Sequence, residues 1–544
     1  MPRMLNILGL QFGHDGSAAI LRDGKLVCAI SRERITRVKK HEGVGKELVD
    51  YVLGEAKLKL SDIHLVAFTS FYYRPDNYVK TLDLQGREVN VDFLDLPGGQ
   101  TIAEAQVLIE NLRIPAVFVH HHMCHAASAF YTSPFERAAC FTLDASMFRP
   151  EACSLCAYGM GNKLHYLYCP GLMVGNAYHE FTEKLGIGSG LTKAGTTMAL
   201  ATYGKPLPAA LEKCDEYGQS FYERRFQPSD PLFIAKMWSE ISGLPPHESF
   251  SREQSDSQRA MDIAASMEHI FQRAIIKNTK KLFEETRHFN DGNLCLSGGS
   301  FLNSQANMAI RQETPFKNVH LFPACGDDGT AVGAALYAAH HLKDVPRVKY
   351  EPREYMYLGR SYPAPAGGEA YNAREVAQLI SEGKIVAWCG GRSEFGPRAL
   401  GNRSLLVDPR RPDMKEILNK RVKKREWFRP FAPVVLSEKA RDWFDLDFES
   451  KLMLFICAIK DPEKIPAVAH VDNSARLQTV AREDNPVLHE LISEFEKITG
   501  VPVLLNTSLN VNNEPLVETP EDAMRFFKNS DVDLLVCEGR VFRK

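Results

Sequence analysis

The sequence contains no apolar run long enough to span a membrane, and it carries almost no net charge. A membrane-spanning helix needs about 20 consecutive apolar residues, and the apolar stretch in MPRMLNILGLQFGHDG is too short for a signal peptide. The net charge is −2 and neither half of the chain is strongly basic, whereas nucleic-acid-binding proteins usually have a basic face. We therefore expect a cytoplasmic protein whose main partner is neither a membrane nor a nucleic acid.

The sequence also lacks a second CxxC beside the one formed by Cys153 and Cys156. A single CxxC in a strand-like stretch is weak evidence for zinc or redox chemistry, so we interpret the pair as two neighbouring thiols. The remaining cysteines are scattered among apolar residues, which is typical of buried free thiols in a reducing compartment.

At 544 residues the chain is too long for one hydrophobic core, and its size predicts two or three domains. Asp23-Gly24 predicts a hairpin near the N-terminus, and a similar strand pair with a Gly-Asn turn recurs at 137–170, which suggests a duplicated domain. Residues 258–285 keep helical spacing. We expect an α/β protein with one domain over residues 1–345, a linker or ordered crossover over 346–372, and a second domain over 373–544.

The segment VHHHMCHAASAF places two histidines on one helical face. His121 and His125 are four residues apart, so both imidazoles can reach one metal ion. Asp144 and Asp327 end apolar strands elsewhere, where a carboxylate can approach a metal or a phosphate. The alternative is a polar helix start with capping histidines, and the residues by themselves leave both interpretations open.

Two glycine-rich turns could approach a ligand closely. In LCLSGGSFLNSQANMAI a buried strand runs into Ser297-Gly298-Gly299 before a helix begins, and Gly13-His14-Asp15-Gly16 has similar properties. Neither turn is a GxGxxG or a GxxxxGK[ST], so neither specifies a nucleotide. A tight strand-to-helix turn without a ligand is the alternative.

Cations crowd two neighbouring segments of the C-terminal half. GGRSEFGPRALGNRSLLVDPR at 390–410 and NKRVKKREWFRPFAP at 419–433 interleave them with glycine, proline and aromatic residues. Rigid turns that present arginine and lysine suit a phosphate or carboxylate ligand. The cations include Arg392, Arg398, Arg403, Lys423, Lys424, Arg425 and Arg429. A nucleic-acid groove and a plain surface charge run are the alternatives, and the net charge and the aromatic spacing argue against them.

Seven segments occur in the order GHDGSAA, HHMCHAASAF, LSGGSFLNSQAN, GRSEFGPRALGNRS, KKREWFRPFAP, HVDNSARLQTV and VPVLLNTSLN. Through them the chain resembles the nodulation and antibiotic O-carbamoyltransferases (the NodU/CmcH type) over nearly its whole length. The resemblance implies a duplicated N-terminal domain of the acetate-kinase, sugar-kinase and actin type (ribonuclease-H-like) and a C-terminal α/β YrdC-like domain.

The resemblance also implies a reaction. Carbamoyl phosphate is hydrolysed to carbamate, which attacks the α-phosphate of ATP to give a carbamoyl adenylate in the C-terminal domain. The carbamoyl group then passes internally to a hydroxyl of a small-molecule acceptor, such as a secondary metabolite in antibiotic biosynthesis, in the N-terminal domain. No motif specifies the acceptor, and the oligomeric state stays open.

Position by position, the resemblance implies roles for individual residues. His14 is the base that deprotonates the acceptor, and the metal ligands are His121, His125, Asp144 and Asp327, with Asp328 a poorer substitute for Asp327. The metal is a divalent ion, with Fe(II) favoured by the imidazoles and Mg(II) accompanying ATP. The nucleotide-binding residues are Gly298, Gly299 and Asn303. The carbamoyl phosphate and adenylate pocket comprises Arg398, Lys423, Arg429, Arg476, Asn506 and Ser508.

Two positions depart from the family pattern. The family usually has Asp-Gly-x-Gly where this chain has Asp144-Ala145-Ser146-Met147, and often Gly-Lys-x-Met where this chain has Gly195-Thr196-Thr197-Met198. The first change stiffens a turn near phosphates and the second removes a cation. Both affect the N-terminal nucleotide contacts more than the C-terminal ones.

Two other functions remain to be distinguished. A tRNA-modifying enzyme of the threonylcarbamoyl type would share the fold but would need an RNA-binding surface, which the charge balance does not indicate. A non-catalytic nucleotide-binding sensor could lose its base or metal set, whereas His14 and all four ligand positions are present. Pyrophosphate release that needs carbamoyl phosphate but not RNA separates the three.

Overall fold

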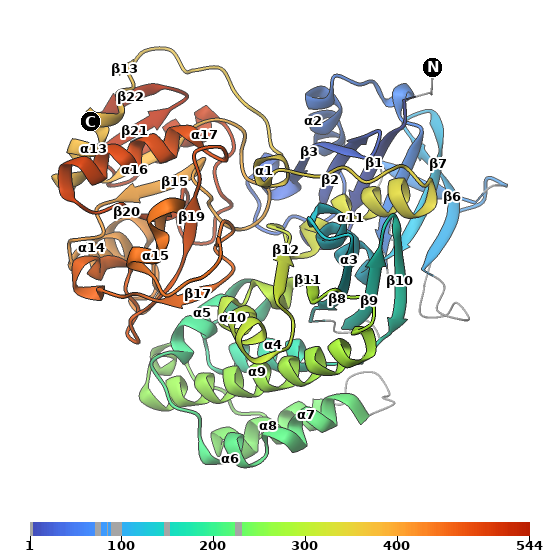
Figure 1. Ribbon diagram of the computed structural model, residues 1–544, viewed down its shortest axis with the longest axis horizontal. Coiled ribbons are helices and arrows are strands. Elements are labelled where there is room, and N and C mark those ends of the chain that lie inside the picture. Colours follow the sequence, from blue (N-terminus) through green and yellow to red (C-terminus); the bar gives the residue numbers. More distant parts are fainter. Residues whose placement is uncertain (1–3, 71–77, 84, 89–100, 146–152, 224–230) are drawn as a thin grey trace.

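The computed structural model describes residues 4–70, 78–83, 85–88, 101–145, 153–223 and 231–544. Three large sheets organise these residues: a seven-stranded and a five-stranded sheet in the N-terminal part and an eight-stranded sheet in the C-terminal part. In Figure 1 the C-terminal sheet and its helices form a body beside the two N-terminal sheets. Within the described ranges, no helix is long and apolar enough to cross a membrane.

The first sheet has the strand order β3-β2-β1-β4-β7-β6-β5. Strands β1, β2 and β3 are antiparallel, and β4 and β7 continue the sheet in parallel with β1. The predicted hairpin is confirmed, because Asp23 and Gly24 connect β2 to β3 and both have positive φ. The strands are β1 (Asn6–Gln11), β2 (Ser17–Arg22), β3 (Lys25–Ser31), β4 (Leu65–Ser70), β5 (Val79–Leu82), β6 (Ile102–Ile109) and β7 (Leu112–His120).

The second sheet repeats this arrangement with the order β10-β9-β8-β11-β12. Its first three strands are again antiparallel, and β11 and β12 are again parallel to the innermost of them. The strands are β8 (Arg137–Leu143), β9 (Ser154–Met160), β10 (Lys163–Tyr168), β11 (Asn293–Ser297) and β12 (Asn318–Leu321). The shared order of three antiparallel and two parallel strands confirms the predicted duplication.

Two helices, one after each N-terminal sheet, pack closely against each other. Helix α3 (His121–Thr132) follows β7, and α11 (Thr330–Leu336) follows the second sheet. A Cβ on Gly333 of α11 would lie 1.8 Å from the carbonyl oxygen of Cys124, and one on Gly9 of β1 would lie 2.1 Å from that of Ala331. Only glycine permits these approaches, so the start of α3 is held next to the segment that precedes α11.

A layer of helices is inserted between β10 and β11 and lies at the bottom of Figure 1. It comprises α4 (Val174–Lys184), α5 (Gly190–Ala201), α6 (Pro208–Glu212), α7 (Cys214–Glu223), α8 (Pro231–Ser242) and α9 (Gln258–Thr286). Helix α9 is the predicted helix at 258–285 and is extended by one residue.

Cys153 and Cys156 are both buried free thiols.

The C-terminal sheet has the order β13-β22-β21-β14-β15-β20-β16-β19 and mixes parallel with antiparallel pairs. Its strands are β13 (Glu369–Ala370), β14 (Val386–Cys389), β15 (Arg403–Val407), β16 (Ala432–Leu436), β19 (Gln478–Val480), β20 (Val503–Ser508), β21 (Leu534–Cys537) and β22 (Arg540–Arg543). Helices α13 (Ala373–Ser381), α16 (Pro486–Thr499) and α17 (Pro520–Asn529) accompany it. The α/β fold class is thereby confirmed.

Residues 346–372 run between the two bodies as a crossover with structure of its own. They contain helix α12 (Pro352–Met356) and end with β13, which pairs with β22. Figure 1 shows this segment passing from the N-terminal sheets to the C-terminal sheet.

Candidate active site

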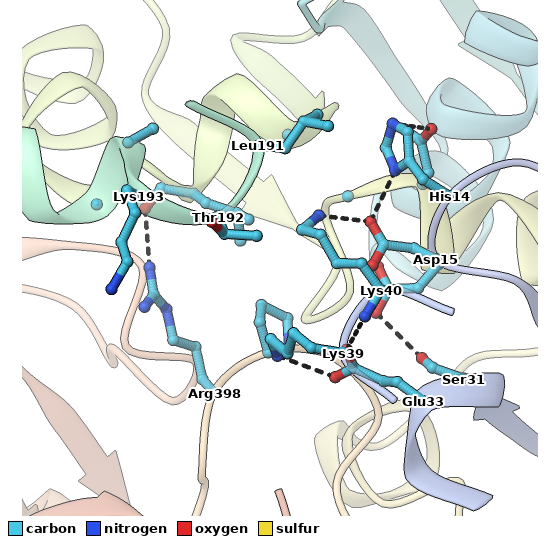
Figure 2. A pocket seen from close by; sticks show the side chains of 18 of the residues that line it. His14, Asp15, Ser31, Glu33, Lys39, Lys40, Leu191, Thr192, Lys193 and Arg398 are labelled. Carbon is cyan, nitrogen blue, oxygen red and sulfur yellow. Dashed lines mark hydrogen bonds and ion pairs between the residues drawn. The ribbon is translucent and has the colours of Figure 1, made fainter. Parts of the chain in front are cut away.

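One cavity of about 1500 Å³ is lined by residues of both bodies. The N-terminal part contributes the turn after β1, the start of α3, the end of β8 and the faces of α4 and α5. The C-terminal part contributes the loops around 398, 425 and 510. Figure 2 shows the resulting arrangement, with His14, Asp15 and Lys40 on one side of the space and Arg398 and Lys193 on another.

Two histidines and two aspartates converge beside this cavity. His121 and His125 lie one turn apart at the start of α3, Asp144 follows β8 directly, and Asp327 precedes α11. His125 Nε2 lies 2.7 Å from Asp144 Oδ2, and His121 Nε2 lies 3.4 Å from Asp327 Oδ1. One ligand atom from each of these four residues lies within 4.8 Å of the others, and no other such group exists in the described part of the chain.

Hydroxyl groups contact the opposite nitrogens of these two rings. Thr69 Oγ1 lies 3.4 Å from His121 Nδ1, and Ser297 Oγ lies 3.3 Å from His125 Nδ1. Such contacts fix the ring orientation and leave each Nε2 facing the carboxylates. Two imidazoles and two carboxylates match the donor set of a first-row transition metal. Asp328 faces away from this group, since its Oδ2 lies 3.4 Å from Ser31 Oγ.

His14 lies in the turn between β1 and β2, beside Asp327. Its Nε2 is 3.4 Å from Asp327 Oδ2, and its Nδ1 is 3.0 Å from Asp15 Oδ2. Lys40 Nζ donates to the same Asp15 oxygen at 2.6 Å, as Figure 2 shows. Asp327 raises the pKa of His14 from 6.5 to about 9, with smaller contributions from Asp15 and against the effect of burial. A divalent cation on Asp327 would offset that carboxylate and lower the pKa again.

The predicted nucleotide turn is tightly constrained. Gly298 has a φ of 107°, and a Cβ there would lie 2.2 Å from the carbonyl oxygen of Leu143. The backbone N–H of Gly299 donates to Asp144 Oδ1. Gly299 borders the cavity, so the turn couples the cavity wall to one of the clustered carboxylates.

Asn303 also borders the cavity, but its side chain has other partners. Its Oδ1 caps helix α10 (Ser304–Glu313), and its Nδ2 donates to both oxygens of buried Glu268 at 3.0 Å. A short 3₁₀ helix (Gly299–Leu302) separates β11 from α10, so the helix does not begin directly after Ser297-Gly298-Gly299 as the sequence suggested.

The C-terminal wall of the cavity carries partly buried arginines with few counter-charges. The cavity is bordered here by Arg398, Arg425, Arg429 and Arg476. Among the described residues, Glu426 is the only carboxylate that pairs with them, at 3.6 Å from Arg429 Nη1. The Nε atoms of Arg398 and Arg476 are buried without a hydrogen-bond partner.

The arginines lower one another's pKa values. Burial, followed by the neighbouring Arg429, lowers the pKa of Arg398 to about 10. Burial also lowers the pKa of Arg476 well below its usual range, and Arg398, Arg425 and Arg429 add to the effect. Uncompensated cations of this kind fit a polyanionic ligand.

Lys423 is held more firmly than the arginines. Its Nζ donates to the carbonyl oxygen of Ser508 at 2.8 Å, to that of Asn510 at 2.8 Å and to Asn510 Oδ1 at 2.7 Å. Asn506 Nδ2 donates to Gln478 Oε1 at 2.7 Å, while its Oδ1 is buried and unpaired. Lys423, Asn506 and Ser508 all border the cavity, so all six predicted C-terminal residues surround one space.

The structure adds residues that the sequence did not single out for the site. Asp15 and Lys40 form the ion pair beside His14, Asn510 holds Lys423, and Lys193 of α5 approaches the C-terminal wall. Asp15 lies within GHDGSAA and Asn510 within VPVLLNTSLN, so both could have been identified from these motifs. Lys40 and Lys193 have no such signal, because only the fold brings them to the cavity.

Two family models match the chain. The carbamoyltransferase N-terminus matches residues 6–336, and the carbamoyltransferase C-terminus matches residues 377–544.

Individual proteins are similar over comparable lengths. The uncharacterized protein sll1178 of Synechocystis sp. is 34% identical, and the match covers 99% of this chain and 97% of that protein. The nodulation protein NolNO of Sinorhizobium fredii is 32% identical over 98% of this chain and 79% of its own length. A solved structure of full-length HypF in its phosphate- and nucleotide-bound form is 13% identical, with a TM-score of 0.32, and the match covers 62% of this chain and 47% of that one. The chain belongs to the carbamoyltransferase family and is a carbamoyltransferase enzyme.

Proposed function

We propose that this carbamoyltransferase is ATP-dependent and transfers the carbamoyl group of carbamoyl phosphate to a hydroxyl of a small molecule through a carbamoyl adenylate. The observation that carries this proposal is that one cavity is bordered by both the arginine wall and residues of the histidine and aspartate cluster. We assign adenylate formation to residues 373–544 and transfer to residues 1–345.

The arginine wall suits the first half of the reaction. Carbamoyl phosphate and ATP are both polyanions, and Arg398, Arg429 and Arg476 can neutralise them through charge-assisted hydrogen bonds. Water hydrolyses carbamoyl phosphate to carbamate and phosphate. A carbamate oxygen then attacks the α-phosphorus of ATP while pyrophosphate leaves. The unpaired Oδ1 of Asn506 can accept a hydrogen bond from the carbamate nitrogen.

The second half of the reaction needs a base near the acceptor. His14 borders the cavity and is partly exposed, so its imidazole can take the proton of a bound hydroxyl. The hydroxyl oxygen attacks the carbamoyl carbon, and AMP leaves with the bonding electrons. Asp15 orients the ring through its contact with Nδ1.

A divalent metal would be held by His121, His125, Asp144 and Asp327. Two imidazoles favour Fe(II) over Mg(II), which prefers oxygen ligands and would accompany ATP. When bound, such an ion supplies a positive charge that can stabilise an oxyanion or a phosphate. The nucleotide contacts proposed for Gly298, Gly299 and Asn303 would be close packing against the cavity wall, which only Gly299 and Asn303 border. The Asn303 side chain and the N–H groups of Gly298 and Gly299 already have protein partners.

Pyrophosphate release by the purified protein tests the proposal. We expect release from ATP only when carbamoyl phosphate is present, and no increase when bulk tRNA is added. A requirement for tRNA would favour the threonylcarbamoyl-type alternative, and binding of ATP without release would favour a sensor. Incubation with a metabolite extract, followed by a mass search for the gain of one carbamoyl group, identifies the acceptor.

A further inference from the structure

The buried carboxylate of Glu518 joins three separate parts of the chain. Its Oε1 accepts hydrogen bonds from the hydroxyls of Tyr51 at 2.9 Å, Ser393 at 2.9 Å and Tyr362 at 3.1 Å. Tyr51 belongs to α2 (Lys46–Ala56) of the N-terminal part, Tyr362 to the crossover, and Ser393 to the C-terminal part. Glu518 is 1% exposed, so these contacts are shielded from solvent.

Arg34 extends this junction from helix α1 (Arg32–Thr36). Its Nη1 lies 3.8 Å from Glu518 Oε2 and donates to the carbonyl oxygen of Val517 at 3.3 Å. Its Nη2 donates to the carbonyl oxygens of Glu394 at 2.9 Å and Gly396 at 3.3 Å. A guanidinium with several fixed donors is well suited to hold two loops at once.

Arg37 makes a second set of contacts just beyond α1. It donates to the carbonyl oxygens of Pro515, at 2.8 Å, and Leu516. The segment around α1 is therefore attached to the loops at 394–396 and 515–517 of the C-terminal part.

These contacts lie immediately behind the wall of the cavity. Glu33 and Lys39, next to Arg34 and Arg37, border the cavity from the N-terminal side, and Glu514 and Leu516 border it from the C-terminal side. The boundary between the two bodies thus passes through the cavity wall at this place, next in sequence to the contacts of Glu518 and Arg34.

We propose that Glu518 is a positioning residue that, with Arg34 and Tyr51, seals this boundary and retains the carbamoyl adenylate until the acceptor arrives. The inference rests on the proposed function. A water oxygen can attack the carbamoyl carbon of the adenylate, AMP leaves with the bonding electrons, and the released carbamate breaks down to carbon dioxide and ammonia. A closed wall slows this loss because it keeps bulk water out and the intermediate in.

The test is pyrophosphate release without an acceptor, followed through the first turnover and beyond. The wild-type protein should release about one equivalent of pyrophosphate quickly and then continue slowly, because the retained adenylate blocks the site. Tyr51→Phe should keep the initial burst but accelerate the later phase at least roughly fivefold, the ratio expected for one lost hydrogen bond. The variant loses the bond to Glu518 and also the bond that the Tyr51 hydroxyl accepts from the backbone N–H of Arg360 at 2.7 Å. Glu518→Gln should accelerate the later phase at least as much.

Tyr217→Phe is the matched control, since it removes a tyrosine hydroxyl that donates to Glu240 at 2.7 Å in the helical layer. It should leave both phases unchanged. If Glu518→Gln fails to fold, Tyr51→Phe by itself tests the inference, because this variant removes a single hydroxyl. A wild-type burst with the same later rate in Tyr51→Phe, or a wild-type protein without a slow phase, overturns this inference and leaves the proposed function standing. A wild-type protein that releases no pyrophosphate overturns the proposed function itself.

Discussion

Replacing Arg476 with methionine should slow pyrophosphate release strongly without lowering the melting temperature. Arg476 ends β18 (Ser474–Arg476), borders the cavity, and has a buried Nε without a hydrogen-bond partner. Its charge is desolvated and lies near Arg398, Arg425 and Arg429. Methionine keeps much of the side-chain volume and removes the charge.

The size of the effect follows from these surroundings. A charge-assisted contact to phosphate in a buried site contributes on the order of 2–4 kcal/mol to the transition state, which corresponds to a roughly 30- to 1000-fold lower rate. In the absence of ligand, removal of Arg476 relieves repulsion from three cations. The free energy of unfolding should therefore stay the same or increase, because a buried cation with no paired anion destabilises the folded state.

Two assays separate these effects. Carbamoyl-phosphate-dependent pyrophosphate release measures the rate, and thermal denaturation with and without ATP measures stability and binding, since a ligand that binds only the folded state raises the melting temperature. ATP should raise the melting temperature of the wild type more than that of the variant. The control is Arg441→Met. Arg441 is exposed and donates to the carbonyl oxygen of Asp447. A variant with a wild-type rate and a lower melting temperature would show that Arg476 is a structural residue.

Three further changes test other parts of the cavity. Lys423→Met should lower the rate of pyrophosphate release by at least roughly 30-fold. It should also lower the melting temperature, because the acceptor atoms of Ser508 and Asn510 lose their buried donor. An unchanged melting temperature would contradict this reasoning. His121→Ala should lower the content of divalent metal, measured by elemental analysis of protein purified without chelators. Equal metal content in wild type and variant would exclude His121 as a ligand. His14→Asn should keep the pyrophosphate burst but reduce carbamoylated product roughly 10²–10⁴-fold, and wild-type product formation in the extract assay would assign the base elsewhere.

Short-range patterns predicted much of the fold. Asp23-Gly24 specifies its hairpin locally because both positions tolerate positive φ, and the helical spacing at 258–285 describes α9 to within one residue. The order of the strands within each sheet could not be derived from such patterns, because pairing between β1 and β4 joins segments that are far apart in sequence. The resemblance to a known family supplied the type of fold of each domain but no strand order.

In the site, too, sequence spacing predicted some features, whereas others depend on contacts between residues far apart in the sequence. The spacing of His121 and His125 places both rings on one side of α3, and the structure brings Asp144 and Asp327 to them. The occupation of the Asn303 side chain by Glu268 was not predictable, because the two residues lie 35 positions apart. Apart from His125 and Gly298, the site residues predicted from the sequence border the cavity, but the sequence could not show which of their atoms are already bonded.

The structure changes the conclusion drawn from Thr196, which stands where the family often has lysine. The sequence has no lysine at this position, which suggested a missing cation in the N-terminal contacts. Thr196 and Lys193 are three residues apart on α5, so they lie on the same side of the helix, and both border the cavity. Lys193 Nζ lies 3.9 Å from Glu426 Oε1. Because Glu426 also pairs with Arg429, the cation of α5 faces the arginine wall of the C-terminal part. The helix therefore still presents a positive charge to the cavity, displaced by one turn toward the side where the phosphates of the proposed reaction would bind.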